Sequence, residues 1–315
     1  MDASTETANL YRAWARVEAH GSSPIYERLA LAVAEDPAAL EFLSEVEPAK
    51  RQPNLLFGAL RWHNVTLEDP AEALAWLREH QDAVLAVMRT RRTQTNEVAR
   101  CATLLPALAL LPQPLALIEV GASAGLCLLY DSWRYHYTGP GVDRWVGSAK
   151  SPLTLSCATT GDVPLPQEVP AIVWRAGLDL NPIDAADPDA RRWLQALIWP
   201  EHHERADRLN AAMDVAAVAA PRIVAGDLAR DLPKLPSTPR SWSPTARHWP
   251  TSNRTSATPS SACSPSPGCT GSAPKARTCC RTSPSRSPTT ATSTDASSCP
   301  WTTARSPWPS HTAAP

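Results

Sequence analysis

The sequence predicts an α/β protein with a helical N-terminal region, an incomplete Rossmann-like parallel sheet and a disordered C-terminal tail. Residues 1–112 carry apolar side chains at helical spacing. Residues 113–235 alternate short apolar runs with helical segments, which is typical of a parallel sheet. Residues 236–315 contain no Leu, Ile, Val, Met, Phe or Tyr, so little apolar burial can offset the entropy of ordering them.

Three proline-containing pairs mark helix starts in the N-terminal region. Ser23-Pro24, Asp36-Pro37 and Asp69-Pro70 each combine an N-cap side chain with proline at the first helical position. After the third pair, we expect one buried stripe made of Leu74, Leu77, Val84, Leu85 and Met88. The expected helices, forming a bundle or a lid, cover residues 4–19, 25–36, 38–46, 54–63 and 71–92.

Residues 94–111 begin polar and end apolar, and we expect a helix that Pro106 breaks or kinks. Its first two turns hold four polar side chains: Gln94, Asn96, Glu97 and Arg100. Two interpretations remain open. These side chains form an exposed first turn with a Glu97–Arg100 ion pair, or they form a polar patch that faces a substrate pocket.

The sheet-forming part is expected to contain three strands. The first, residues 115–120, is a continuous apolar run, as expected of a strand covered on both faces. The second and third cover residues 171–174 and 222–227. Helices are expected over residues 124–137, 189–199 and 201–219, and a hairpin around residues 153–157 in the loop-rich stretch 138–170.

The turn after the first strand, within LIEVGASAGL, carries Glu119, Gly121 and Gly125, with Ser123 between the glycines. Glycine permits a positive φ and lets a ligand approach the backbone. A helix that starts here would offer free N–H groups to an anionic or polar group. The turn is therefore a candidate ligand site. The alternative is a tight corner that only packs the core.

Two acidic residues follow the next two strands. Asp179 lies just past the second strand, where an acid commonly binds ribose hydroxyls. Asp227 lies just past the third strand, where a side chain can meet a base. Because ligands of open α/β sheets bind at the carboxyl ends of the strands, both acids join the candidate site.

Long stretches of the sequence carry a family resemblance: TQTNEVARCATLLPALA, LALIEVGASAGLCLLYDSWRYHY, VWRAGLDLNPID and RRWLQALIWPEHHERADRL. They resemble DUF2332, a family of uncharacterised actinobacterial proteins, through most of residues 20–235. The family usually has Asn where this chain has Cys127. The glycine turn is also similar to the first motif of class I S-adenosylmethionine-dependent methyltransferases.

The second resemblance implies a methyltransferase-type sheet and S-adenosylmethionine as cofactor. Gly121 and Gly125 would let the methionine end approach, and Glu119 would orient the turn. Asp179 would accept hydrogen bonds from the ribose, and Asp227 would lie near the adenine. The small-molecule methyl acceptor and the catalytic base stay unidentified, with His136 a candidate by sequence position alone. The alternative is a non-catalytic regulatory protein that binds a nucleotide or another small molecule.

The tail has the composition that a shifted reading frame gives in a GC-rich gene. Of its 80 positions, 75 hold residue types whose codons have C or G in the middle. The DUF2332 family continues after Leu235 with a strand resembling VVFHSAVL or VVFHTAVL, and codons from Ser237 on, moved by one base, can spell such a strand. We therefore expect an out-of-frame tail and an inactive chain. A natural basic tail and a nucleic-acid-binding arm are the alternatives.

Loss of later strands would have a structural consequence. In methyltransferase strand order, the missing fourth strand is the neighbour of residues 115–120. Its loss would leave an apolar strand edge unpaired, and such edges promote aggregation.

Charge and cysteine usage exclude several classes. Residues 1–235 hold 22 basic and 30 acidic residues, a net charge of −8, which argues against a nucleic-acid groove. The sequence shows neither a secretory signal nor a run near the roughly 18 apolar residues of a spanning helix, so we expect a cytoplasmic protein without a membrane partner. Cys101, Cys127 and Cys157 lie far apart and are expected as buried thiols. No His–Cys spacing predicts a metal site.

Overall fold

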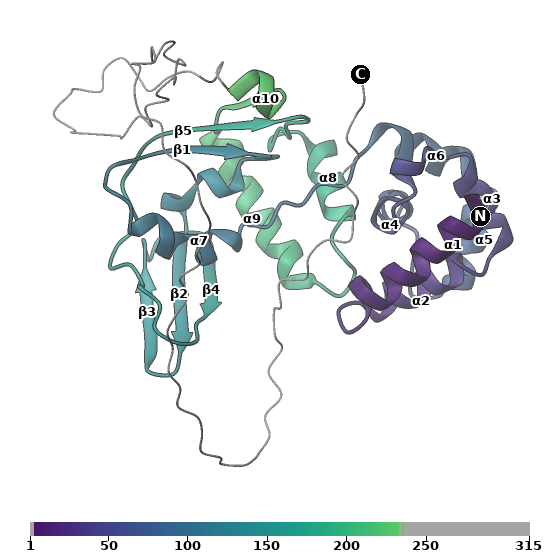
Figure 1. Cartoon of the computed structure of the whole chain (residues 1–315), viewed down its shortest axis with the longest axis horizontal. Coiled ribbons are helices and arrows are strands. Elements are labelled where there is room, and N and C mark those ends of the chain that lie inside the picture. Colours follow the sequence, from purple (N-terminus) through teal and green to yellow (C-terminus); the bar gives the residue numbers. More distant parts are fainter. Residues whose placement is uncertain (1–2, 233–234, 236–315) are drawn as a thin grey trace, which may run out of the picture. The chain divides into compact units, whose positions relative to one another are not determined.

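A computed structural model describes residues 3–232 and 235, so the expected tail, residues 236–315, lies outside the described residues. The described part contains a helical region followed by an α/β region with a parallel sheet, which confirms the expected fold class (Figure 1). The helical region consists of α1 (Ala3–Trp14), η1 (Ala15–Ala19), α2 (Pro24–Val33), α3 (Pro37–Ser44), η2 (Pro48–Lys50), α4 (Pro53–Trp62), α5 (Pro70–Glu79) and α6 (Gln81–Thr90).

The three expected helix starts are confirmed. The side chains of Ser23, Asp36 and Asp69 each accept a hydrogen bond from a backbone N–H group in the helix that follows, and proline opens each helix. The expected helix 71–92 is instead two helices, α5 and α6, because His80 leaves the helical conformation with φ −129°. The expected stripe from Leu74 to Met88 is nevertheless buried throughout.

An aromatic cluster forms the centre of the helical region. Tyr26 and Phe57 lie with ring centroids 4.8 Å apart, and Trp14 packs edge-on against Phe57 at 5.8 Å. Trp199, which follows α8 much later in the chain, packs edge-on against Trp14 at 5.5 Å. The carboxylate of Glu201 caps the start of α2 by accepting hydrogen bonds from Ser23 Oγ (2.6 Å) and the Ile25 N–H (2.9 Å). The segment that holds Trp199 and Glu201 therefore packs against the N-terminal helices, although it lies far from them in sequence.

The parallel sheet contains, within the described residues, β1 (Leu115–Val120), β5 (Ile172–Asp179) and β6 (Ile223–Ala225), in the order β1-β5-β6. The expected strands are present, but the second is longer than predicted and ends at Asp179 itself. The third is shorter than predicted. Among the described strands, β1 lies at one edge of this sheet.

The helix expected over residues 124–137 is wrong. The chain instead forms two short turns, η3 (Leu126–Leu128) and η4 (Tyr130–Ser132), and then β2 (Arg134–Gly139). Tyr135 and Tyr137 are buried, whereas their neighbours along the strand are less so. This alternation with a period of two marks a strand with one covered face. The apolar run just before it has no such alternation, so the whole segment was predicted as one helix.

A second sheet with the order β3-β2-β4 follows, made of β2, β3 (Val142–Val146) and β4 (Thr154–Ala158). The hairpin expected around residues 153–157 is wrong, because β4 pairs in parallel with β2. The hairpin instead joins β2 to β3, with Gly141 at φ +71° in its turn.

The expected helix over residues 94–111 begins later, as α7 (Arg100–Ala109). Pro106 lies inside α7 and does not break the helix, which leaves the kink as the remaining prediction. The Tyr137 hydroxyl donates to the Ala102 carbonyl oxygen at 2.8 Å, which fixes α7 against the second sheet.

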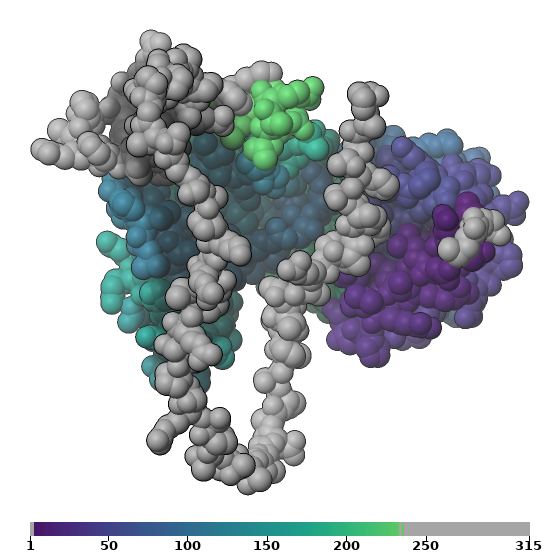
Figure 2. Space-filling model, viewed as in Figure 1, coloured from purple at the N-terminus to yellow at the C-terminus, as the bar shows by residue number. Residues whose placement is uncertain are grey.

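Three helices complete the α/β region: α8 (Pro188–Ala196), α9 (His203–Ala219) and α10 (Leu228–Asp231). The Asp187 side chain caps α8 by accepting a hydrogen bond from the Asp189 N–H, and α10 was not predicted. Met213 and Ala216 of α9 belong to a buried cluster against which the partly buried Leu117 of β1 packs, so α9 lies on one face of the parallel sheet. In the space-filling view, α10 lies at the surface (Figure 2).

The opposite face of the parallel sheet is less covered. Ile118 and Val120 of β1 are 51% and 49% exposed. Within the described residues, β1 pairs only with β5, so its outer edge has no strand beside it. In the same part of the chain, no helix is long and apolar enough to cross a membrane.

Candidate functional site

The glycine turn lies at the carboxyl end of β1, against the end of β5. Gly121, Ser123 and Gly125 have φ values of +74°, +50° and +70°. The Gly121 N–H donates to the Leu178 carbonyl oxygen at 2.8 Å, which continues the pairing of β1 with β5 into the turn. The turn thus contains three residues with positive φ and does not start an α-helix.

The two glycines have different surroundings. A Cβ at Gly121 would meet nothing within 4 Å. A Cβ at Gly125 would lie 2.9 Å from Pro221 Cγ and 3.0 Å from Ile223 Cδ1. Gly125 therefore fits the hypothesis of a tight corner that packs the core. Gly121 borders open space and fits the hypothesis of a ligand site.

The expectation of free backbone donors in the turn is wrong. The N–H groups of Gly121 and Ala122 both point to the Leu178 oxygen, and the Gly125 N–H donates to the Ala122 oxygen. Ser123 N–H donates to Asp179, and Ala124 N–H donates to Asn96. Every N–H group from residue 121 to residue 125 thus has a protein acceptor, because the turn closes on itself instead of opening a helix.

Asp179, the last residue of β5, holds two loops with one carboxylate. Its Oδ2 accepts from the Ser123 N–H at 2.7 Å, and its Oδ1 accepts from the Asn181 N–H at 2.7 Å. Each oxygen keeps a further lone pair, so the group can still accept another hydrogen bond.

Glu119 is the most unusual ionisable group near the turn. Its Oε2 atom is buried and, among the described residues, has no hydrogen-bond partner. Burial raises the pKa of Glu119 from its ordinary value of 4.5 to about 7; the Arg100 guanidinium opposes this rise and the Asp179 carboxylate adds to it. A buried acceptor without a partner is costly, so a cationic or hydrogen-bond-donating ligand would stabilise it.

The connection between α6 and α7 brings Asn96 to the turn. Asn96 Nδ2 donates to Ser123 Oγ at 2.8 Å, and Asn96 Oδ1 accepts from the Ala124 N–H at 3.2 Å. Arg100, in the first turn of α7, is close enough to Glu119 to lower its pKa. Asn96 therefore supports the turn directly, and Arg100 acts on it through charge.

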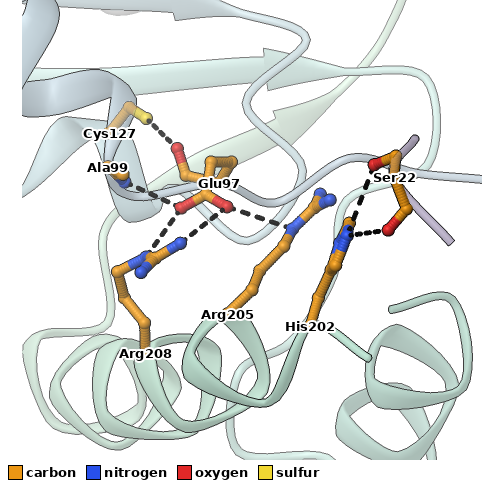
Figure 3. A network of polar contacts seen from close by, with 7 residues as sticks. All are labelled: Ser22, Glu97, Ala99, Cys127, His202, Arg205 and Arg208. Atoms are coloured by element: carbon orange, nitrogen blue, oxygen red, sulfur yellow. Dashed lines mark hydrogen bonds and ion pairs between the residues drawn. The ribbon is translucent and has the colours of Figure 1, made fainter. Parts of the chain in front are cut away.

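The arginine partners of Glu97 lie on α9, and Arg100 is not one of them. Glu97 forms ion pairs with two arginines of α9: its Oε1 lies 3.0 Å from Arg208 Nε, and its Oε2 lies 3.0 Å from Arg205 Nε (Figure 3). The Ala99 N–H also donates to Glu97, and the Cys127 thiol lies 3.7 Å from the Glu97 carbonyl oxygen. These contacts hold the pKa of Glu97 below its ordinary value despite its partial burial. The side-chain pairing expected between Glu97 and Arg100 is replaced by contacts with α9.

Asp227 and His136 lie in other settings. Asp227 caps α10 by accepting from the Ala229 N–H at 2.9 Å, while the preceding Gly226 N–H donates to the backbone carbonyl oxygen of Asp179 at 2.9 Å. His136 lies on β2 in the second sheet, where its Nε2 is 2.8 Å from Asp143 Oδ1. Among the described residues, no group of three or more His, Cys, Asp or Glu side chains could hold a metal ion.

A cavity of about 300 Å³ adjoins the turn. It touches the turn through Ala124 and the loop after Asp179 through Ile183, and Pro221 and Ile223 form another wall. Its volume is at the lower end of the range for small-molecule sites. The cavity and the arginine partners of Glu97 were not foreseen, because both depend on how α9 packs against the sheet.

One protein family matches this chain, over residues 8–246, and its description reads "Uncharacterized protein conserved in bacteria (DUF2332)". The chain belongs to the DUF2332 family. The resemblance expected from the glycine turn and the VWRAGLDLNPID segment is confirmed at the level of this family. Among curated proteins and solved structures, none matches the chain.

Proposed function

We propose that the carboxyl ends of β1 and β5 bind S-adenosylmethionine, and that DUF2332 proteins with a complete sheet are methyltransferases. One arrangement carries this proposal: Glu119, whose buried Oε2 has no described hydrogen-bond partner, and Asp179 lie near the ends of the paired strands β1 and β5, next to the turn in which a Cβ at Gly121 would meet nothing within 4 Å. Acids at the ends of parallel strands, next to a glycine turn, are typical of sites for a ribose-bearing ligand.

The local charge favours this ligand over a dinucleotide. Adenosylmethionine carries a positive sulfonium and an ammonium group, which Glu119 and Asp179 would attract. A pyrophosphate is anionic and depends on free N–H groups at a helix start. Here the N–H groups from Gly121 to Gly125 have protein acceptors, and the turn leads into η3, a three-residue 3₁₀ helix.

The residues present divide the ligand between them. Asp179 would accept hydrogen bonds from the ribose hydroxyls with its remaining lone pairs, and Glu119 would face the cationic end at Gly121. The cavity at Ala124 and Ile183 would take the flat, largely apolar base. Gly125 would support the fold alone, because Pro221 fills its surroundings.

Bound adenosylmethionine would supply a methyl group on a positively charged sulfur. The protein must then exclude water and hold the acceptor in line with that methyl group. Glu119 would hold or release a proton near neutral pH, because its pKa is raised to about 7.

We further propose that the chain from Pro236 onward is out of frame and that this chain is catalytically inactive. The outer edge of β1, which has no strand beside it in the described part, supports a missing neighbour. The DNA around codons 230–240 tests this. A second frame that continues as an apolar, strand-like segment would support it, whereas the absence of such a segment from both other frames would contradict it.

Thermal unfolding of the full 315-residue chain tests whether adenosylmethionine binds. Adenosylmethionine at about 100 times its Kd should add about 2.7 kcal/mol of stability, and NAD should add none. No shift with adenosylmethionine would contradict the proposal, and a larger shift with NAD would indicate a dinucleotide site instead.

A non-catalytic binding protein is the second candidate. The observation that favours it is the self-contained turn, in which Asp179 and Asn96 already satisfy backbone donors. Binding of adenosylmethionine without methyl transfer in a frame-restored chain would favour this candidate.

A further inference from the structure

A second cavity, of about 320 Å³, lies between the end of α6, the segment that follows it and the loop after β5. It is lined by Thr90, Arg91, Arg92, Gln94, Asn181, Ile183 and Trp193. Two of these residues carry positive charge and none carries negative charge. This lining is positive, although residues 1–235 carry a net charge of −8.

The two arginines of this cavity have no carboxylate partner among the described residues. The Arg91 guanidinium instead lies over the Trp62 ring, 4.7 Å from its centroid, and 5.9 Å from the Trp193 ring. Stacking leaves the N–H groups at the edge of a guanidinium free to donate. Arg92 is exposed, and its side chain makes no hydrogen bond or ion pair with a described residue.

The backbone around the cavity is fixed by its own contacts. The Trp193 indole N–H donates to the Arg92 carbonyl oxygen at 2.9 Å. The Gln94 amide donates to the Asn181 carbonyl oxygen at 2.9 Å, which joins the segment after α6 to the loop after β5. The backbone that carries the two arginines is therefore already fixed. Less conformational entropy of the backbone is then lost when the arginines bind an anion.

Nearby cations strengthen the same field. The Arg192 guanidinium lies 4.4 Å from the Trp62 centroid, on the ring that Arg91 also contacts, and donates to the Trp62 carbonyl oxygen at 2.6 Å. The Lys50 ammonium donates to the carbonyl oxygens of Met88 and Arg89 at the end of α6. No ion pair with a described carboxylate neutralises either cation.

We propose that this cavity binds a small organic anion, a carboxylate or a phosphate ester, with an apolar part against Ile183 and Trp193. Arg91 and Arg92 would bind the anionic group, and the Gln94 and Asn181 amides would border it. Charge-assisted bonds from arginine to carboxylate or phosphate are among the strongest hydrogen bonds in proteins. The site is distinct from the turn from Gly121 to Gly125, although Ile183 also lines the cavity proposed for the adenine base, and its test needs no adenosylmethionine.

The test uses fluorine NMR on the full chain with three probes: 4-fluorobenzoate, 4-fluorophenyl phosphate and the neutral 4-fluorobenzamide. We expect at least one anionic probe to bind about tenfold more tightly than the amide, and higher salt to weaken it. Binding of the benzoate alone identifies a carboxylate ligand, and binding of the phosphate alone identifies a phosphate ester. Equal binding of all three probes, or no binding of either anion, would overturn the proposal.

Matched variants locate the binding. Arg92→Gln should weaken the anionic probe about tenfold. Arg89→Gln removes the same charge one turn earlier in the chain, outside the cavity lining, and should change affinity less than about twofold. Equal effects of the two substitutions would overturn the assignment to this cavity. The comparison of the benzoate with the amide in the unaltered chain needs no variant and stands if a substituted chain fails to fold.

Discussion

The carboxylate of Asp179 accepts a hydrogen bond from the backbone N–H of Ser123, with 2.7 Å between Oδ2 and N. Its other oxygen accepts from the Asn181 N–H, also at 2.7 Å. One side chain at the end of β5 therefore holds the glycine turn and also the loop that borders the proposed anion cavity. A substitution of Asp179 should therefore alter the structure of both candidate sites.

Replacing Asp179 with Asn should separate its two roles. The amide can still accept one of the two hydrogen bonds, so we expect a loss of about 1–3 kcal/mol in the free energy of unfolding. The added stability from adenosylmethionine should fall, because only one uncharged acceptor oxygen remains for the backbone and the ribose. Thermal unfolding with and without ligand measures both. Asp189→Asn, at an exposed position in α8, should leave the ligand effect intact, and an unchanged ligand effect in Asp179→Asn would contradict the ribose role.

The two glycines should respond oppositely in stability and in ligand binding. Gly125→Ala should cost about 3 kcal/mol or more, because its Cβ would contact Pro221 and Ile223 and its φ is positive. Gly121→Ala should cost only the strain of its positive φ, about 1–2 kcal/mol, yet reduce the stabilisation by adenosylmethionine. Urea unfolding with and without ligand compares them. Equal costs would show that the surroundings of the two glycines are alike in solution.

The raised pKa of Glu119 predicts a pH-dependent cost. The folded protein holds this proton up to about pH 7, whereas the unfolded chain releases it near 4.5. Between these values the unfolded state binds fewer protons, so the contribution of Glu119 to stability falls as pH rises and stays low above pH 7. Glu119→Gln should therefore gain about 2 kcal/mol relative to the native chain between pH 5 and pH 8.

Urea unfolding of both proteins at pH 5, 6, 7 and 8 tests the Glu119 prediction. A difference that does not change with pH would contradict a buried, partnerless carboxyl group. The lowered pKa values of Glu97 and Glu201 affect stability only as pH falls below their ordinary value of 4.5, outside this window.

Glu97 should contribute more to the free energy of unfolding than an exposed glutamate in a polar stretch of sequence would. Glu97→Gln leaves Arg205 and Arg208 without their shared carboxylate, and we expect a loss of about 2–3 kcal/mol. Glu204 is exposed on α9, the helix that carries both arginines. Glu204→Gln should lower the free energy of unfolding by about 0.5 kcal/mol or less. Chemical denaturation measures both. A comparable loss in the two variants would show that the α9 contacts contribute little.

The exposed side of β1 predicts self-association. Ile118 is half exposed on a strand that, in the described part of the chain, has a partner on one side only. Ile118→Lys should lower light scattering by the purified chain, whereas Val218→Lys, on exposed α9 surface, should not. A monomeric native chain with a sharp cooperative melt would contradict the prediction.

Local sequence chemistry predicted the elements that depend on neighbouring residues. The caps at Ser23, Asp36 and Asp69 and the strand from residue 115 to residue 120 follow from a few adjacent side chains, and each is confirmed. The parallel order followed from the alternation of strands and helices. These features need no knowledge of distant contacts.

The errors have a common physical origin in tertiary contacts. The segment after Gly125 reads as a helix, yet Tyr135 and Tyr137 gain more by packing one face of a sheet, with Tyr137 bonded to α7. Glu97 has an arginine three residues later, yet its partners come from α9. A sequence read alone does not show that these distant groups meet.

Hydrogen–deuterium exchange of the full chain, followed by mass spectrometry, tests the central proposal most directly. With adenosylmethionine we expect slower exchange in peptides that cover residues 117–126 and 176–183, and no such change with NAD. Unchanged exchange in both segments at saturating adenosylmethionine, or protection confined to other parts of the chain, would contradict binding at Gly121 and Asp179.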